Sequence, residues 1–326
     1  MSTIRPRRLR SDLNIRNMVR ETRISSKSLI LPLFIKEGSS IKEPIVTLEG
    51  HSYYSPDTVQ EGIEQALACN IKTVLLFGIP KEKDDIGSGA YCENGVVQQA
   101  VRHIKAMYPG VTVITDVCMC EYTSNGHCGI VENDRVVNDV SLPYIAKIAL
   151  SHVKAGADMV APSDMMDKRV KAIRKILDDN GFYETPIMSY AVKYSSAFYG
   201  PFRDVAKSAP SFGDRKTYQM DYHNRREALR EALLDIEEGA DILMVKPAMS
   251  YLDIVRELRD NTQSPICAYS VSGEYAMIKS AAQKGYIDEY AAMCESAAGV
   301  FRAGADMLIS YYAKELSKAI EKGDIG

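Results

Sequence analysis

Three stretches of the chain repeat one pattern: Ala155-Gly-Ala-Asp-Met-Val160, Glu238-Gly-Ala-Asp-Ile-Leu243 and Ala303-Gly-Ala-Asp-Met-Leu308. Each follows a segment with helical periodicity and begins a short apolar run that is typical of a buried strand. The glycine suits the left-handed conformation that ends a helix, and the small alanine lets helix and strand approach closely. One helix-to-strand junction used three times predicts a repetitive α/β fold, although barrels and open sheets both use such junctions.

Eight short apolar runs with strand character occur along the chain, and amphipathic helical stretches separate most of them. The runs are Leu29–Phe34, Thr73–Ile79, Val111–Val117, Met159–Ala161, Ile187–Val192, Ile242–Val245, Ile266–Ser270 and Met307–Tyr311. Alternating strands and helices form a parallel sheet covered by helices, and eight strands are the number that closes a barrel. The sequence predicts an α/β fold: a single (β/α)8 TIM barrel over residues 25–326, preceded by an extended arm.

The composition excludes several classes of protein. Lys and Arg number 40 against 43 Asp and Glu, which gives a net charge of -3, and 46% of the 326 residues are hydrophobic. These values exclude a disordered chain and a supercharged nucleic-acid binder. No apolar run approaches the roughly 20 residues of a membrane span, and the N-terminus lacks the apolar core of a secretory signal. We therefore expect a cytoplasmic protein with no membrane partner.

Residues 1–24 form a basic arm. Its arginines are Arg5, Arg7, Arg8, Arg10, Arg16, Arg20 and Arg23. No aromatic side chains are interleaved to stack bases, which disfavours a nucleic-acid partner. Asp12 and Glu21 disfavour a transit peptide. We expect the arm to pack on another subunit or on its own barrel.

Two lysines follow neighbouring apolar runs. Lys246 ends Leu243-Met-Val-Lys-Pro247, and Lys193 follows the run that ends at Val192. Barrel active sites lie at the carboxyl ends of the strands, and adjacent strands lie about 4.8 Å apart. Two ammonium groups so close repel, which lowers one or both pKa values from about 10.4 toward neutrality. Because a neutral amine attacks ketones to form Schiff bases, Lys193 and Lys246 are candidate catalytic residues. The alternative is a pair of surface lysines whose ammonium groups reach solvent.

Three of the seven cysteines are clustered in the sequence. Cys118 and Cys120 follow one apolar run, and Cys128 comes from the Gly-rich loop after it. In a reducing compartment, clustered thiols favour metal binding over disulfides. Three thiolates supply three corners of a tetrahedral site and leave the fourth open, as in a catalytic zinc site. His127 is a candidate fourth ligand, and three ordinary core thiols are the alternative.

The segment Tyr194–Gln219 lacks a helical period and contains several aromatic residues and breakers. A connection of that length within a compact domain is usually a lid or a binding loop. It carries Arg203 and Arg215, whose guanidinium groups suit carboxylates, although solvated charge on a mobile loop is the alternative. Ser272 and Tyr311 lie near other strand ends and are candidate hydrogen-bond donors.

The chain resembles the porphobilinogen synthase, or δ-aminolevulinate dehydratase, family from its arm to Tyr311. The stretches that carry the resemblance are Asp116-Val-Cys-Met-Cys120, Gly126-His-Cys-Gly129, Ala161-Pro-Ser-Asp-Met-Met166, Asp214-Arg-Lys-Thr-Tyr-Gln219, Leu243-Met-Val-Lys-Pro247 and Val271-Ser-Gly-Glu274. The resemblance implies a lyase that condenses two 5-aminolevulinate molecules to porphobilinogen, with loss of two waters, for haem and other tetrapyrroles. It also implies a homo-octamer in which the arm wraps a neighbouring subunit.

The resemblance assigns a role to each candidate residue. Lys246 matches the Schiff-base lysine of the first substrate, and Lys193 matches the lysine of the second subsite. The other matches are Ser272 and Tyr311 for the first carboxylate, Arg203 and Arg215 on the lid for the second, Cys118, Cys120 and Cys128 for the zinc of the zinc-dependent branch, and Glu231 for an allosteric magnesium at a subunit interface. Asp116 is implied to lie near the active site, with no role assigned.

Two other functions fit parts of the sequence. A Schiff-base aldolase on the same barrel needs one lysine and often a phosphate site, and it leaves the three clustered cysteines unexplained. A zinc-binding scaffold that assembles through its basic arm binds the metal without turning over 5-aminolevulinate.

Overall fold

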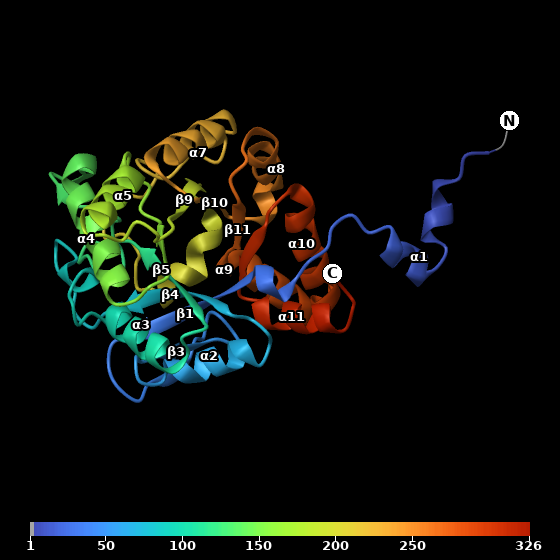
Figure 1. Cartoon of the computed structure of the whole chain (residues 1–326), viewed down its shortest axis with the longest axis horizontal. Coiled ribbons are helices and arrows are strands. Elements are labelled where there is room, and N and C mark those ends of the chain that lie inside the picture. The colour runs from blue at the N-terminus through green and yellow to red at the C-terminus, as the bar shows by residue number, and fades with distance from the viewer. Residues whose placement is uncertain (1–2) are drawn as a thin grey trace.

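The computed structural model describes residues 3–326, in which eight parallel strands form a barrel (Figure 1). The strands are β1 Leu29–Lys36, β4 Thr73–Ile79, β5 Thr112–Val117, β8 Met159–Pro162, β9 Met188–Lys193, β10 Ile242–Lys246, β11 Ile266–Ser270 and β12 Met307–Ser310. Seven neighbouring pairs run continuously in the order β8-β5-β4-β1-β12-β11-β10-β9. The remaining seam is narrow, with a parallel bridge between Val160 and Ile187 and a 3.2 Å bond from Val160 N to Pro186 O. The predicted barrel is confirmed.

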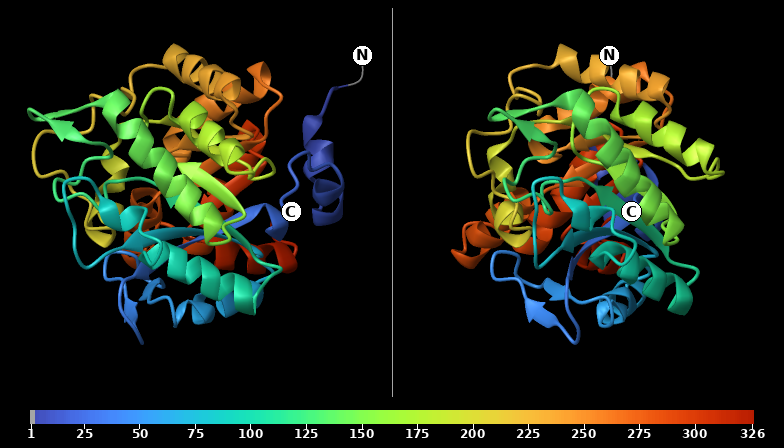
Figure 2. Two further views of the ribbon diagram at one scale, coloured as in Figure 1. Left: turned by 60° about the vertical axis from the view of Figure 1, so that its left-hand side comes forward. Right: turned by 90° about the vertical axis from the view of Figure 1, so that its left-hand side faces the viewer.

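Helices surround the barrel and connect its strands (Figure 2). They are α2 Val59–Leu67, α3 Val96–Met107, α4 Asn138–Lys154, α5 Arg169–Asp179, α6 Gly200–Val205, α7 Arg226–Glu238, α8 Leu252–Asn261, α9 Ser272–Gln283, α10 Glu289–Ala303 and α11 Ala313–Glu321. Two small additions are β2 Lys42–Pro44 with β3 Ser52–Tyr54 beside β1, and the hairpin β6 Val131–Glu132 with β7 Arg135–Val136 before α4. Within residues 3–326, no helix has the length and apolar character needed to cross a membrane.

The N-terminal segment stands away from the barrel (Figure 1). It contains the short 3-10 helix η1 Pro6–Arg10 and the helix α1 Leu13–Met18, whose first turn is capped by the Asp12 carboxylate. Most of its apolar side chains are exposed, with Ile4 at 89% and Met18 at 72% of full exposure. Apolar side chains in this state are the expected property of a segment that is covered by another surface.

The repeated Gly-Ala-Asp motif forms a helix end as expected. Gly156 and Gly239 have φ of 106°, and Gly304 has φ of 122°, in a region where a side chain would be strained. Each of the three therefore lets its helix stop and the chain turn directly into β8, β10 or β12.

The aspartate of each motif has a further role at the amino end of the barrel. Asp158 accepts a 2.8 Å hydrogen bond from Val113 N, and Asp306 accepts one of 2.8 Å from Ile266 N. Asp241 accepts one of 2.7 Å from Ile187 N. Each donor lies on or beside the strand next to that of its aspartate, so the aspartates link pairs of strands and supply acceptors for backbone N–H groups.

A bulge in β9 sets the register of the two lysines. Leu243 pairs with Ser189, but Val245 pairs with Val192, so β9 carries one residue more than β10 over this interval. An extra residue shifts every side chain beyond it to the other face of the strand. As a result Lys193 lies directly beside Lys246 at the carboxyl end of the barrel.

Candidate active site

Lys246 ends β10 and lies in an aromatic enclosure. Its side chain is buried, and its Nζ lies 4.5 Å from the ring centroid of Tyr269 and 5.1 Å from those of Tyr190, Tyr199 and Phe202. Burial lowers the pKa of Lys246 to about 7, and the charge of Lys193 lowers it as well. A lysine with its pKa lowered in this way is partly neutral near pH 7, and a neutral amine is the form that attacks a carbonyl group.

Lys193 ends β9 beside Lys246 and faces the same enclosure. Its Nζ donates a hydrogen bond to the backbone oxygen of Ser163 and lies 5.5 Å from the ring centroid of Tyr190. Lys193 is also buried. Two amines from neighbouring strands thus meet in a space bounded by aromatic rings.

Asp116, near the end of β5, is a buried carboxylate close to both lysines. Its Oδ2 accepts a 3.1 Å bond from Ser163 Oγ, and its Oδ1 has no hydrogen-bond partner among the described residues. Burial raises the pKa of Asp116 to about 7, and the charge of Glu121 raises it too, while both lysines act in the opposite direction. The carboxylate and the two amines share one electrostatic environment.

The three clustered cysteines meet directly beyond β5. The Sγ atoms of Cys118, Cys120 and Cys128 all lie within 4.8 Å of one another, and all three residues are buried. Three converging thiols without a disulfide fit a soft divalent metal such as zinc. The donor set is therefore suitable for the metal that the sequence predicts.

His127 does not join this cluster. Its Nδ1 lies 3.0 Å from Tyr218 Oη, and its Nε2 lies 3.1 Å from the backbone oxygen of Phe212. Both ring nitrogens are used by the segment predicted as a lid, so the candidate fourth-ligand role is wrong for this structure. The sequence could not reveal this because the partners lie more than 80 residues away.

The segment Tyr194–Gln219 covers the carboxyl end of the barrel, and it includes the short helix α6 Gly200–Val205 that sequence periodicity did not reveal. Arg215 is buried and donates from Nη2 to the backbone oxygens of Gly126, at 2.9 Å, and Ser208. Burial lowers the pKa of Arg203, and the neighbouring Arg215 lowers it further. The Nε atoms of both arginines are buried without a hydrogen-bond partner among residues 3–326.

Ser272 and Tyr311 each contact a residue of the aromatic enclosure. Ser272 begins α9, and its Oγ accepts a 2.9 Å bond from Phe202 N at the start of α6. Tyr311 follows β12, and its Oη lies 3.2 Å from that of Tyr269, whose ring contacts the Lys246 amine. The structure brings these two hydroxyls to the same end of the barrel as the lysines and thiols.

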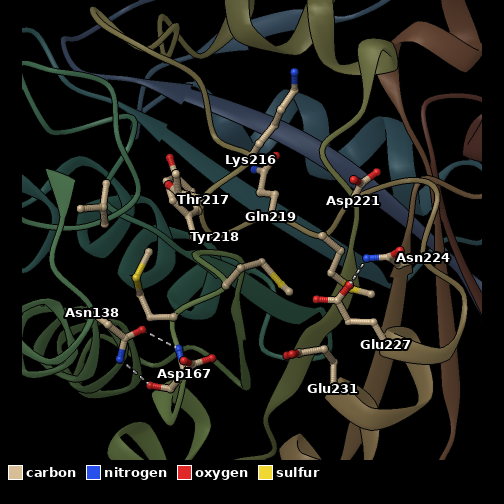
Figure 3. A pocket seen from close by; sticks show the side chains of 14 residues that line it. Asn138, Asp167, Lys216, Thr217, Tyr218, Gln219, Asp221, Asn224, Glu227 and Glu231 are labelled. Carbon is tan, nitrogen blue, oxygen red and sulfur yellow. Dashed lines mark hydrogen bonds between the residues drawn. The ribbon is translucent and has the colours of Figure 1, made fainter. Parts of the chain in front are cut away.

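Glu231 lies elsewhere, on α7. It lines a cavity of about 370 Å³, and neither Lys193 nor Lys246 is part of the lining. In Figure 3 the side chains of Glu231 and Glu227 point into this hollow, across from Asn138 and Asp167. Burial raises the pKa of Glu231. Among residues 3–326, these oxygen atoms do not converge as the three thiols do, and Asn138 Oδ1 already accepts a 2.7 Å bond from Asp167 N.

The aromatic enclosure was not foreseen from the sequence. Tyr190, Tyr199, Phe202 and Tyr269 come from β9, η4 Ala197–Tyr199, α6 and β11, and no spacing along the chain links them. One signal was available, since Tyr190 and Lys193 lie three residues apart in one strand. They share a face only if the strand carries a bulge.

Comparison with known proteins agrees with this geometry. The family model described as delta-aminolevulinic acid dehydratase matches residues 3–319. The delta-aminolevulinic acid dehydratase of Halalkalibacterium halodurans is 52% identical over 314 residues, which cover 96% of each chain. That of Staphylococcus aureus is 51% identical over 320 residues, covering 98% of this chain and 99% of the other.

A solved structure extends the similarity to three dimensions. The crystal structure of delta-aminolevulinic acid dehydratase (porphobilinogen synthase) from Toxoplasma gondii, in complex with the reaction product porphobilinogen, superposes with a TM-score of 0.95. It is 42% identical and covers 99% of this chain and 94% of that chain. The aldolase and scaffold alternatives do not account for these matches. The chain belongs to the delta-aminolevulinic acid dehydratase family.

Proposed function

We propose that the chain is a lyase that condenses two molecules of 5-aminolevulinate into the pyrrole porphobilinogen with release of two waters. Two C5H9NO3 molecules give C10H14N2O4 and two H2O, one water for each substrate ketone oxygen. The observation that carries the proposal is the Lys246 amine, buried among aromatic rings beside a second lysine at the open end of the barrel.

Lys246 holds the first substrate. At pH 7 a lysine with a pKa of about 7 is about half neutral, whereas one at about 10.4 is neutral in roughly one molecule in 2,500. The neutral Nζ attacks the ketone carbon, the carbonyl oxygen leaves as water, and an imine forms. The surrounding rings exclude bulk water that would return the imine to ketone and amine.

Lys193 and the carboxylate-binding residues hold the second substrate and orient both. Ser272 and Tyr311 offer hydroxyls to the first carboxylate. Arg203 and Arg215 offer cationic donors to the second, and each has a buried Nε without a partner in the described chain. The amine of one substrate replaces the lysine nitrogen on the former ketone carbon of the other and frees the lysine. The carbon next to that centre gives up a proton and bonds to the remaining ketone carbon, whose oxygen leaves as the second water, and loss of a further ring proton gives the pyrrole.

Cys118, Cys120 and Cys128 would hold zinc. When bound, the ion supplies Lewis acidity close to the reacting carbonyl groups. The support lies in the donor set, which is three buried thiols within 4.8 Å of one another. A cytoplasmic, reducing compartment keeps these thiols available, in agreement with seven cysteines that form no disulfide.

The remaining parts of the proposal concern regulation and assembly. Glu231 would bind magnesium as an allosteric ion, and its position in an acidic hollow supports this assignment. Residues 1–24 would wrap a neighbouring subunit in a homo-octamer, which the exposed apolar side chains of the arm support. The barrel of residues 25–326 carries the chemistry, with residues 194–219 as its lid.

The decisive experiment is incubation with 5-aminolevulinate, with and without zinc, followed by an assay for pyrrole. We expect activity that chelation abolishes and zinc restores. Borohydride should trap substrate on Lys246, identified by peptide mapping. A zinc-loaded, folded enzyme that forms no pyrrole refutes the function, and an adduct found only on other lysines refutes the assignment of Lys246.

Magnesium is tested separately. Glu231→Ala should remove magnesium stimulation and leave zinc binding intact, while Glu237→Ala, an exposed glutamate on the same helix, should leave the stimulation unchanged. Stimulation of Glu231→Ala equal to that of the wild type contradicts the assignment.

A further inference from the structure

The loop that carries the thiols is joined to the lid by a set of hydrogen bonds. We define the metal loop as residues 118–128 and the lid as residues 194–219. The bonds between them are Ser211 N to Asn125 O at 2.9 Å, Arg215 Nη2 to Gly126 O at 2.9 Å, His127 Nδ1 to Tyr218 Oη at 3.0 Å and His127 Nε2 to Phe212 O at 3.1 Å. All four involve Asn125, Gly126 or His127, the three residues that immediately precede Cys128.

His127 is the side chain at the centre of this contact. Because the Phe212 carbonyl can only accept, His127 Nε2 carries the proton and donates to it. In the neutral ring Nδ1 then accepts from the Tyr218 hydroxyl. The ring also packs on Phe212, with centroids 4.5 Å apart, and the residue is 2% exposed. One buried side chain thus engages two positions of the lid.

The metal loop is itself held in one shape. His127 N donates to Asn125 Oδ1 at 2.9 Å, and Thr123 Oγ1 donates to His127 O at 2.9 Å. Gly126 has φ of 71°, and a Cβ there would lie 2.3 Å from Ala209 O. The loop backbone therefore touches the lid backbone directly, and a shift of either segment disturbs the other.

We infer that His127 is a positioning residue that couples metal binding at the three thiols to closure of the lid. The inference rests on the proposed zinc site and extends it to the loop that covers the second substrate. A metal that holds Cys128 in place also holds His127, the residue immediately before it, and so favours the closed lid. Coupling of this kind is reciprocal, so a closed lid strengthens metal binding by the same factor.

The lid offers a direct readout in Lys216, an exposed trypsin site. Wild-type enzyme with zinc should be cleaved there at least about fivefold more slowly than the zinc-free enzyme, the lower end of ordinary coupling. Zinc affinity is measured in parallel by competition with a chromophoric chelator. His127→Ala and Tyr218→Phe should both lose the protection that zinc gives against cleavage at Lys216. Because the coupling is reciprocal, both variants should also bind zinc more weakly, by the factor that the protection shows in the wild type.

Tyr218→Phe is the sharper variant because it removes one hydroxyl and leaves the metal loop untouched. Its matched control is Tyr222→Phe, since Tyr222 is 59% exposed and just beyond the lid. The control should behave as the wild type, and a control that behaves like Tyr218→Phe overturns the coupling.

The remaining outcomes separate this inference from the proposed function. If His127→Ala weakens zinc binding but Tyr218→Phe does not, His127 acts on the metal directly and the coupling is wrong. If zinc binds and turnover is normal but zinc leaves trypsin cleavage at Lys216 unchanged, only the coupling is refuted. If the wild type binds no zinc at the three thiols, the zinc site and the coupling both fail.

Discussion

At the amino end of the barrel, Asp158, Asp241 and Asp306 each accept a hydrogen bond from a backbone N–H on or directly before the neighbouring strand. At the carboxyl end, Asp116 Oδ1 and the Nε atoms of Arg203 and Arg215 are buried without a partner among residues 3–326. Buried polar groups are normally satisfied, and although Gln98 and His152 on the outer helices also keep unpartnered atoms, the charged ones near the lysines are positioned to meet a ligand. We therefore expect substitutions at the amino end to change the free energy of unfolding, and substitutions at the carboxyl end to change turnover.

The largest effect expected at the carboxyl end follows from removing its central amine. Lys246→Met should lower kcat by at least about 10³-fold, because no other group at that position forms the imine. The free energy of unfolding should stay the same or rise, since a buried amine no longer has to be desolvated. Turnover and a urea titration check the two halves. If Lys246→Met kept a tenth of the wild-type kcat, the contrast between the two ends of the barrel would be wrong.

The corresponding change at the amino end should affect stability alone. Asp306→Ala leaves Ile266 N without this acceptor and removes the ion pair with Arg259, at a cost of about 1–3 kcal/mol. The kcat of the folded fraction should match the wild type. Asp179→Ala is the control, because Asp179 pairs only with the exposed Lys175 and should change stability by less than about 0.5 kcal/mol. Equal effects from both variants would contradict the aspartate's strand-tying role.

The pH dependence of Lys246 sharpens the contrast. Labelling of its amine by acetic anhydride should rise about tenfold per pH unit below a midpoint near pH 7 and level off above it. Lys193→Met should raise the midpoint by removing a like charge. Because the folded-state pKa lies below the unfolded value of about 10.4, the unfolded chain binds more protons between pH 7 and 10.4. The Lys246 contribution to stability therefore falls as pH drops through that window. A midpoint near 10 would refute the depressed pKa.

The smallest effect concerns a single helix end. Gly239→Ala places a side chain at φ of 106° and 3.1 Å from Arg174 Cγ, so we expect a loss of about 1 kcal/mol and unchanged kcat. Gly110→Ala is the control, since a Cβ there meets nothing within 4 Å and its φ is outside the left-handed region. Thermal unfolding distinguishes the two variants. If Gly239→Ala left the free energy of unfolding unchanged, glycine would not be required at this helix end.

Much of the fold is determined by local sequence. Eight apolar runs, helical periods between them and the repeated Gly-Ala-Asp junction depend only on neighbours within a few residues, and they define the barrel. The positions of Lys193, Lys246, Cys118 and Cys120 at strand ends follow from the same pattern, and Cys128 follows in the loop after the same strand. Parallel strands bring their carboxyl ends to one edge, so residues far apart in sequence could be grouped correctly.

The tertiary structure alone decided the register and the pairing of buried groups. The bulge in β9 that sets Lys193 beside Lys246 depends on how two strands pack, and the strand composition does not encode it plainly. The binding of His127 by Tyr218 and Phe212, rather than by the metal, depends on where the lid comes to rest. Burial shifts the pKa of Lys246 to about 7 only after four separate elements have enclosed the amine. These properties arise from contacts between distant segments, and so the chain has to fold before they exist.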